Sequence, residues 1–226
     1  AGLHIPSFSS WAQLTGSSLK IAVNNGYCFA GNAALFGCSD FRIATKTSWI
    51  GMAGPAMIKG GGLGVFEPTD IGPVSVHEKN GVVDYVATNE EEATLIAKKL
   101  LSYFQGSIED FAVGDQEILQ NIMPEDRRYT YEIRDIINTV SDQDSFLELR
   151  KKYGASIVTG FIRIEGKPFA LLASDCQKLG GAIDSESAEK AADFISICND
   201  HALPILVLAD TPGFMVGPAS EELGAV

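Results

Sequence analysis

The sequence predicts an α/β fold with a linker near its middle, and three observations support this prediction. Short apolar strands are followed by glycine-bearing loops and then by helical segments, an order that is typical of α/β proteins. The 226 residues are 46% hydrophobic and 20% charged, which suffices for the core of one large domain or two modest ones. A stretch with little periodicity, residues 105–127, divides the chain.

The first half alternates strands and helices. We expect the end of a helix at 8–18, a strand at 19–23, a helix at 32–38 and a strand at 41–44. Residues 51–72 are rich in Gly and Pro. Because they lack the pattern GxxxxGK[ST], we interpret them as a flexible loop over a pocket rather than a phosphate loop.

The strongest helical pattern covers residues 89–104. Thr88 or Asn89 can cap it, three glutamates occupy its first turn, and Lys98 and Lys99 come late, so the charges complement the helix dipole. An apolar stripe on one side predicts a packed surface helix.

The second half predicts a hairpin followed by a helix and a strand. Residues 156–164 and 168–173 flank Glu165-Gly166-Lys167, a typical hairpin turn. The wholly apolar strand at 204–209 is expected to be central and buried. Helices are expected at 133–140, 144–152 and 185–202. We therefore divide the chain into a first part at 1–104, a linker at 105–127 and a second part at 128–226.

Composition argues against several classes of protein. The net charge is −12 and no Lys/Arg run exists, so we expect no nucleic-acid binding. No apolar run is long enough for a membrane span, and no Cys/His cluster has zinc spacing, so neither a membrane role nor a metal site is expected. The chain begins without Met and stops where a helical pattern starts, so we interpret both ends as internal cuts.

The four cysteines form no CxxC pair, and we interpret them as reduced, buried small side chains. Reduced thiols suit a reducing compartment, which predicts the cytoplasm, or the mitochondrial matrix in a eukaryote.

Two glycine-bearing loops are the candidate sites, residues 26–34 and 178–184. Each follows a strand and precedes a helix, so backbone N–H groups and a helix N-terminus meet there. Such a cradle suits an anion or a developing oxyanion. The alternative is that these small residues serve only turn geometry.

The same loops lie within motifs that resemble a known family. The run from Ile21 through Gly26-Tyr27 and Ala30-Gly31 to Arg42-Ile43-Ala44 is similar to the crotonase-superfamily signature. The second half resembles the carboxyltransferase (beta) subunits of propionyl-CoA and acetyl-CoA carboxylases. Its matching motifs are Ile157-Val158-Thr159-Gly160-Phe161, Arg163-Ile164-Glu165-Gly166-Lys167-Pro168, Gly181-Ala182-Ile183-Asp184, Lys190-Ala191-Ala192-Asp193-Phe194-Ile195 and Asp210-Thr211-Pro212-Gly213-Phe214.

The resemblance covers nearly the whole chain and implies a crotonase-like (ClpP/crotonase) ββα superhelix with two truncated half-domains. Residues 1–104 would be the C-terminal part of the N-terminal half, and residues 128–226 the N-terminal part of the C-terminal half. The implied activity moves CO2 from carboxybiotin to the alpha carbon of a short-chain acyl-CoA, such as propionyl-CoA or acetyl-CoA.

The resemblance also implies roles for particular residues. The backbone amides of Ala30 and Gly31 would stabilise the thioester oxygen, and those of Gly181 and Ala182 the biotin urea oxygen. The implied substrate-binding residues are Phe29, Gly54, Pro55, Asp184, Gly213 and Phe214.

Some of these positions have alternative interpretations. Asp184 is equally a helix N-cap, and Gly54-Pro55 can be a plain turn. Asp210 follows a strand at its carboxyl end, where ligands gather in α/β folds, but it can equally organise the turn at Thr211-Pro212-Gly213. His77 is expected to be structural because it has no evident partner, and His201 should interact with the end of its helix.

The implied cofactors and partners lie outside this chain. No Ala-Met-Lys-Met motif is present, so biotin would be carried on a separate domain or subunit. ATP and Mg²⁺ would be used only at a partner biotin carboxylase. Acyl-CoA would be the substrate, a biotin carboxyl carrier a further partner, and a dimer-based homo-oligomer such as a hexamer the assembly.

The chain departs from the family pattern in three places. Ala30 stands where the family has Gly, Gly72-Pro73-Val74 replaces Gly-Gly-Ala, and Gly60–Gly64 is unusual, which leaves substrates other than propionyl-CoA open. The alternatives are a biotin-dependent decarboxylase subunit, a crotonase-type hydratase or isomerase, and a non-enzymatic assembly fragment. Since each site would lack one of its loops, the isolated chain is expected to bind acyl-CoA poorly and not to turn over.

Overall fold

The computed structural model describes residues 5–126 and 129–224. The chain forms two compact units, residues 1–99 and 100–226. The predicted boundary between 127 and 128 and both chain ends lie outside the described residues. The division into 1–104, 105–127 and 128–226 therefore stays a prediction.

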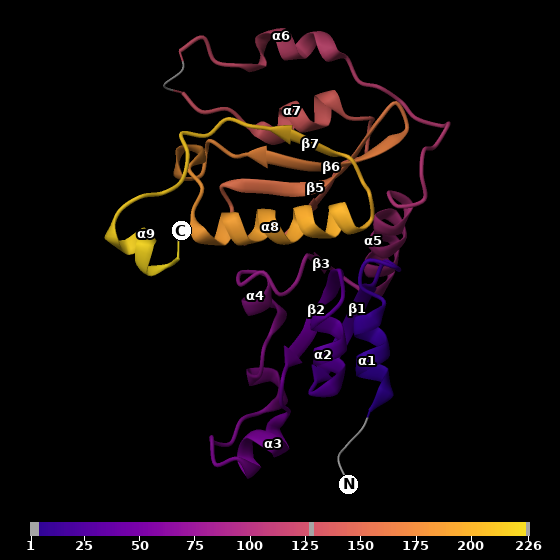
Figure 1. Cartoon of the computed structure of the whole chain (residues 1–226), viewed down its shortest axis with the longest axis vertical. Helices are drawn as coiled ribbons and strands as arrows, with labels where there is room; N and C mark the ends of the chain where they lie inside the picture. Colours follow the sequence, from indigo (N-terminus) through magenta and orange to yellow (C-terminus); the bar gives the residue numbers. More distant parts are fainter. Residues whose placement is uncertain (1–4, 127–128, 225–226) are drawn as a thin grey trace. The chain divides into compact units, whose positions relative to one another are not determined.

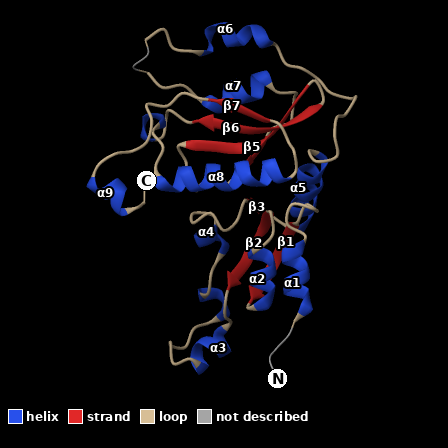
Figure 2. Ribbon diagram, viewed as in Figure 1, coloured by secondary structure: helices blue, strands red, loops and turns tan. Residues whose placement is uncertain are grey.

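The first unit is built on a parallel sheet of three strands in the order β1-β2-β3 (Figures 1 and 2). A helix, α2, connects β1 to β2, and the buried side chains of the three elements form a common core. The elements of this unit are α1 (Pro6–Gln13), β1 (Ile21–Phe29), α2 (Gly31–Gly37), β2 (Phe41–Gly51), α3 (Pro55–Gly60), α4 (Val74–His77), β3 (Tyr85–Ala87) and α5 (Glu90–Ser102), which ends in the second unit.

Both long strands exceed their predicted lengths. Residues 24–29, expected to be loop, continue β1 as far as Phe29, and β2 continues to Gly51. The two strands stay paired because a register shift between Asn24 and Gly26 absorbs the irregularity. The sequence alone signalled a break at Asn24-Asn25-Gly26, but pairing with β2 overrides that local preference.

Two further expectations in this unit have clear outcomes. The predicted loop 51–72 contains the short helix α3. The predicted helix 89–104 is confirmed as α5, and its cap is Asn89, whose Oδ1 accepts a hydrogen bond from the Glu92 N–H at 2.9 Å.

The second unit is built on a four-stranded mixed sheet in the order β4-β5-β6-β7 (Figure 2). The β4–β5 and β5–β6 pairs are antiparallel, and β6–β7 is parallel. The predicted hairpin is confirmed, with Glu165 and Gly166 both at positive φ in its turn. The elements are α6 (Leu119–Ile122), α7 (Ile133–Val140), β4 (Leu147–Leu149), β5 (Ile157–Ile164), β6 (Lys167–Ser174), α8 (Ser185–Asp200), β7 (Ile205–Leu208) and α9 (Pro218–Glu222).

The predicted helix at 144–152 is wrong. Residues 147–149 form β4, whose Leu147 and Leu149 are buried and pair with β5. Asp144 and Arg150 have positive φ, which a helix does not allow. The leucine spacing suits both a strand and a helix turn, and pairing with β5 decides between them.

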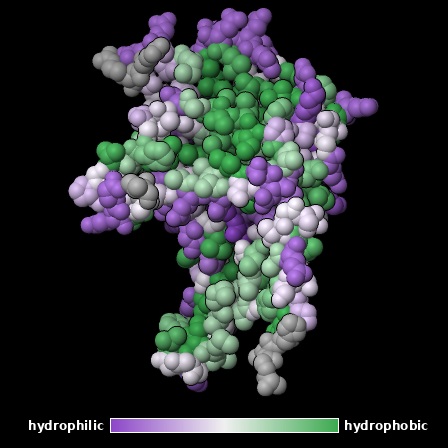
Figure 3. All heavy atoms as spheres, in the orientation of Figure 1, coloured by the Kyte–Doolittle hydropathy of each residue, from purple (hydrophilic) through white to green (hydrophobic). Residues whose placement is uncertain are grey.

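The prediction for residues 204–209 was half right. The strand exists as β7, but it is the last in the sheet order and Val207 is 54% exposed. Figure 3 shows hydrophobic side chains gathered on the face of this unit where β6 and β7 lie. An apolar strand therefore need not be central, because its side chains also serve an outward-facing surface.

The cysteines differ in their exposure to solvent. All four are free thiols; Cys28 and Cys198 are buried, Cys176 is half-buried and Cys38 is exposed. Burial raises the pKa of the Cys198 thiol to about 12, so this thiol stays protonated. The expectation of buried cysteines is therefore wrong for Cys38, which lies just beyond α2.

A buried lysine fixes the turn after β4. Lys190, on α8, is 1% exposed. Its Nζ donates to the carbonyl oxygens of Arg150 at 3.0 Å, Tyr153 at 3.0 Å, Gly154 at 3.3 Å and Ile157 at 2.6 Å. The ammonium thus connects α8, the 150–154 turn and the start of β5.

This lysine predicts a pH-dependent stability. Burial lowers the pKa of Lys190 from 10.5 to about 8, because desolvation disfavours the ammonium. Between these pH values the unfolded chain binds a proton that the folded chain has released, so the contribution of Lys190 to stability rises with pH. We expect the melting-temperature gap between wild type and Lys190→Met to widen from pH 8 to pH 10.5. A constant gap would contradict the lowered pKa.

Candidate active site

The first candidate cradle lies where β1 ends and α2 begins. Ala30 joins them at φ 56°, and Gly31 is the first residue of α2. A Cβ at Gly31 would lie 3.0 Å from Cζ of Phe8, so a larger residue would press on α1. The chain therefore turns sharply at Ala30, and Gly31 lies half-buried against Phe8 of α1.

Three of the predicted substrate-binding residues lie together beside this cradle. A Cβ at Gly54 would lie 3.4 Å from Cδ2 of Phe29, and a Cβ at Gly51 would lie 3.4 Å from Cδ1 of the same ring. Pro55 follows directly as the first residue of α3. The structure thus gathers Phe29, Gly54 and Pro55 at the end of the β1–β2 pair.

The amides of this cradle are not equivalent. The Ala30 N–H donates to the Gly51 carbonyl oxygen at 3.0 Å, so it already has an acceptor. Gly31 opens α2, and the N–H groups of a first helical turn have no acceptor within the helix. Gly31 is therefore the better-placed oxyanion donor of the two.

The second candidate cradle lies between β6 and α8. Leu179, Gly180 and Gly181 have φ of 50°, 63° and 80°, a left-handed run that favours glycine. The Gly181 N–H donates to the Lys178 carbonyl at 2.8 Å, and the Ala182 N–H to the Leu179 carbonyl at 3.1 Å. The two amides predicted to face an oxyanion thus both have acceptors within their own loop.

This loop is fixed against the turn that follows β7. Ile183 donates to the Gly213 carbonyl at 3.0 Å and accepts from the Met215 N–H at 2.8 Å. A Cβ at Gly181 would lie only 2.5 Å from the Asp210 carbonyl oxygen. The structure therefore brings together predicted residues that are about 30 positions apart in sequence, namely Gly181, Gly213 and Phe214.

Asp184 caps α8. Its Oδ1 accepts a hydrogen bond from the Ser187 N–H at 2.9 Å, which is one of its two predicted roles. The pocket-shaping role stays a prediction.

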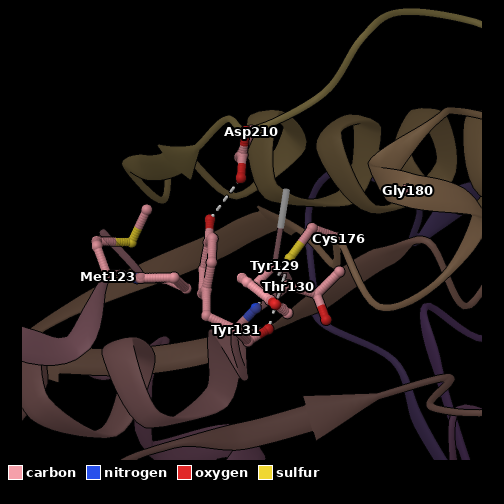
Figure 4. Close-up of a pocket in the computed structure, with 8 residues that line it drawn as sticks. Met123, Tyr129, Thr130, Tyr131, Cys176, Gly180 and Asp210 are labelled. Carbon is pink, nitrogen blue, oxygen red and sulfur yellow. Dashed lines mark hydrogen bonds between the residues drawn. The ribbon is translucent and has the colours of Figure 1, made fainter. Parts of the chain in front are cut away.

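A pocket of about 450 Å³ opens beside Gly180, a volume that is typical of small-molecule sites (Figure 4). Its lining residues are Met123, Pro124, Tyr129, Thr130, Tyr131, Cys176, Gly180 and Asp210. The Tyr131 hydroxyl donates to Asp210 Oδ2 at 2.8 Å. Burial and the Asp210 carboxylate both raise the pKa of Tyr131, so the hydroxyl stays protonated.

Sequence reasoning found Asp210 but missed Tyr131 and Cys176. Tyr131 and Asp210 are 79 positions apart, and no motif of the sequence connects them. The only available signal was the place of Asp210 at the carboxyl end of a strand, where ligands gather in α/β folds.

In the part of the chain that the structure describes, the histidines and acidic residues do not converge on a metal centre. His77 Nε2 lies 2.7 Å from the Ile50 carbonyl oxygen, which fits its expected structural role. Among residues 5–126 and 129–224, no three His, Cys, Asp or Glu side chains converge as a metal site. Within the same ranges, none of the helices combines the length and the hydropathy that crossing a bilayer requires.

Comparison with known proteins gives these loops a family context. Residues 7–226 match the model of the carboxyl transferase domain. The methylmalonyl-CoA carboxyltransferase 12S subunit of Propionibacterium freudenreichii subsp. shermanii is 30% identical, over 97% of this chain and 44% of that protein. The propionyl-CoA carboxylase beta chain of Saccharopolyspora erythraea is also 30% identical, over 100% of this chain and 45% of that protein. The chain thus spans less than half the length of these relatives.

Solved structures agree with the sequence matches. A single-chain, multi-domain long-chain acyl-CoA carboxylase has a TM-score of 0.97 and 48% identity, over 100% of this chain and 23% of that chain. The transcarboxylase 12S hexamer, solved with hydrolysed methylmalonyl-CoA bound, has a TM-score of 0.84 and 29% identity, over 97% of this chain and 45% of that chain. These matches confirm the crotonase-like fold implied by the sequence motifs. The chain belongs to the carboxyl transferase domain family.

Proposed function

We propose that the protein containing this chain transfers a carboxyl group from carboxybiotin to the carbon alpha to an acyl-CoA thioester. The observation that carries the proposal is the match to an acyl-CoA carboxylase at 48% identity and a TM-score of 0.97, over the whole chain. At that identity both loops are expected to lie at the substrate sites, although the Gly181 and Ala182 N–H groups have acceptors within their own loop.

In the first unit, the Gly31 N–H would stabilise the thioester oxygen as the enolate forms. A backbone donor directed at developing negative charge is typically worth about 10²–10³ in rate. Phe29, Gly54 and Pro55 would contact the acyl group, because they lie together beside this amide.

In the second unit, the pocket beside Gly180 has the size and chemistry for a small neutral ring such as biotin. Met123 and Pro124 offer apolar surface, while Thr130 offers a polar group for the urea. Bound there, carboxybiotin would supply CO2 and a basic urea nitrogen. The residues of the chain would hold the ring, orient it and exclude water.

The cofactor and its partners would reach this protein from elsewhere. We propose that biotin arrives on a biotin carboxyl carrier and is charged by a biotin carboxylase that uses ATP and Mg²⁺. A homo-oligomer is proposed by analogy with the transcarboxylase 12S hexamer.

Two acyl classes compete as substrate. A short-chain acyl-CoA is supported by the propionyl-CoA and methylmalonyl-CoA relatives at 30% identity. A long-chain acyl-CoA is supported by the long-chain carboxylase at 48% identity. The segment around α3 also exposes a set of apolar side chains that suits a long acyl tail. These side chains are Met52, Met57, Leu63, Val65 and Phe66.

The test uses the full-length protein with its biotinylated partner. Carboxylation of acetyl-CoA, propionyl-CoA and palmitoyl-CoA is followed with labelled bicarbonate, and the reverse reaction is followed as biotin-dependent decarboxylation of methylmalonyl-CoA. We expect biotin-dependent activity with at least one ester, and the preferred ester identifies the acyl class.

Other results would select the alternatives. Turnover of a CoA ester without biotin would contradict the proposal and support a hydratase or isomerase. Biotin-dependent CO2 release without carboxylation in the presence of ATP would support a decarboxylase subunit. Turnover by the isolated 226-residue chain would contradict its expected inactivity.

A further inference from the structure

One tyrosine connects the two segments that enclose Gly181. The Tyr131 hydroxyl donates to Asp210 Oδ2 at 2.8 Å, on the turn after β7. The Tyr131 backbone N–H and carbonyl each lie 3.5 Å from Cys176 Sγ, at the start of the 178–184 loop. Tyr131 thus contacts both sides of the pocket, and Figure 4 shows its ring extending from Cys176 toward Asp210.

Gly181 occupies the space between these same two residues. A Cβ built on it would lie 2.5 Å from the Asp210 carbonyl oxygen and 3.7 Å from Cys176 Cα. Because Gly181 has no side chain, it cannot set this spacing through side-chain contacts of its own. Tyr131 contacts Asp210 through its side chain and Cys176 through its backbone, so it can set the distance between these two residues.

The hydrogen bond to Asp210 lies at an exposed position but has a charged acceptor. Its acceptor is a carboxylate, and hydrogen bonds to charged groups stabilise more than bonds between neutral groups. It also joins segments 79 positions apart, so losing it frees one side of the pocket relative to the other.

We propose that Tyr131 and Asp210 are positioning residues that set the width of the pocket beside Gly180 for the biotin ring. The inference rests on the proposed function, which places biotin at this loop. The proposal predicts that loss of this pair impairs the use of biotin without impairing the use of the CoA ester.

The test measures methylmalonyl-CoA decarboxylation by the full-length protein with free biotin as the acceptor. Tyr131→Phe keeps the ring and removes the donor. We expect kcat/KM for biotin to fall about tenfold, the effect of one lost charge-assisted hydrogen bond. The KM for methylmalonyl-CoA should stay unchanged, because the first unit binds that substrate. A merely structural role would not separate the two constants.

A second tyrosine–carboxylate pair provides the matched control. The Tyr153 hydroxyl donates to Glu189 Oε2 at 2.7 Å in the same unit, and neither residue lines the pocket. Tyr153→Phe should leave kcat/KM for biotin within twofold of wild type, even where it lowers the melting temperature.

Two Asp210 variants complete the design. Asp210→Asn keeps an oxygen acceptor for Tyr131 and should retain most of the activity, whereas Asp210→Ala should match Tyr131→Phe. Tyr131→Phe and Asp210→Ala remove the same hydrogen bond. The double variant should therefore have a kcat/KM for biotin no lower than that of either single variant.

Several outcomes would overturn the inference. These are an unchanged kcat/KM for biotin in Tyr131→Phe, an equal fall in Tyr153→Phe, or a rise in the KM for methylmalonyl-CoA alone. If the proposed function itself were wrong, the activity of the wild-type protein would not depend on biotin, which distinguishes this case from the outcomes above.

Discussion

Replacing Gly181 with alanine is expected to lower biotin-dependent turnover of the full-length protein about 100-fold, the typical effect of moving a reacting group by about 1 Å. The new Cβ would lie 2.5 Å from the Asp210 carbonyl oxygen, a distance that two non-bonded atoms do not tolerate. Gly181 also has φ 80°, which L side chains rarely adopt. The loop and the turn after β7 must therefore separate.

The control is a glycine with the same backbone strain but open space. Gly106 has φ 92°, and a Cβ there would meet nothing within 4 Å. Gly106→Ala should cost about 1 kcal/mol of stability and leave turnover close to wild type. Steady-state assays and thermal melting of both variants separate the clash from the strain. Equal activity in the two variants would show that the contact between Gly181 and Asp210 does not matter.

Replacing Lys190 with methionine is expected to destabilise the protein by about 3 kcal/mol or more, because each buried carbonyl left without its donor costs about 1–3 kcal/mol. Methionine keeps much of the side-chain length, so packing is largely preserved. Four carbonyl oxygens, in the turn after β4 and at the start of β5, would lose the hydrogen bond that Nζ donates. The melting temperature should fall by about 10 °C.

Lys151→Met is the matched control. The Lys151 side chain is 68% exposed, and its Nζ lies 3.9 Å from a Glu148 oxygen, so its removal should change stability by less than about 0.5 kcal/mol. A melting temperature of Lys190→Met equal to that of Lys151→Met would show that the buried ammonium does not hold this turn. Near-ultraviolet circular dichroism reports whether the tertiary structure survives each change.

Local patterns by themselves determined a large part of this fold. The helix α5, the hairpin β5–β6 and the helix α8 follow from caps, apolar stripes and a Gly-bearing turn. These signals are read from neighbouring residues, so no tertiary information is needed. The family motifs likewise follow directly from the sequence, and the comparisons confirm them.

The tertiary structure decided what depends on distant partners. Residues 144–152 have helix-compatible spacing, yet pairing with β5 and the ammonium of Lys190 hold them as a strand and a turn. The amides of Ala30, Gly181 and Ala182 were predicted to be available, but backbone carbonyls already accept from them. Hydrogen-bond partners depend on φ, ψ and chain packing, which residue identity alone does not fix.

The candidate site likewise combines features that the local sequence predicts with features that only tertiary contacts decide. The sequence by itself placed glycine at 181 and the Asp210-Thr211-Pro212-Gly213 turn after a strand. Only the tertiary structure set Tyr131 between Cys176 and Asp210, through contacts that span 45 and 79 positions. Such contacts form when the chain collapses around its core, and their entropic cost is met by packing over the whole unit.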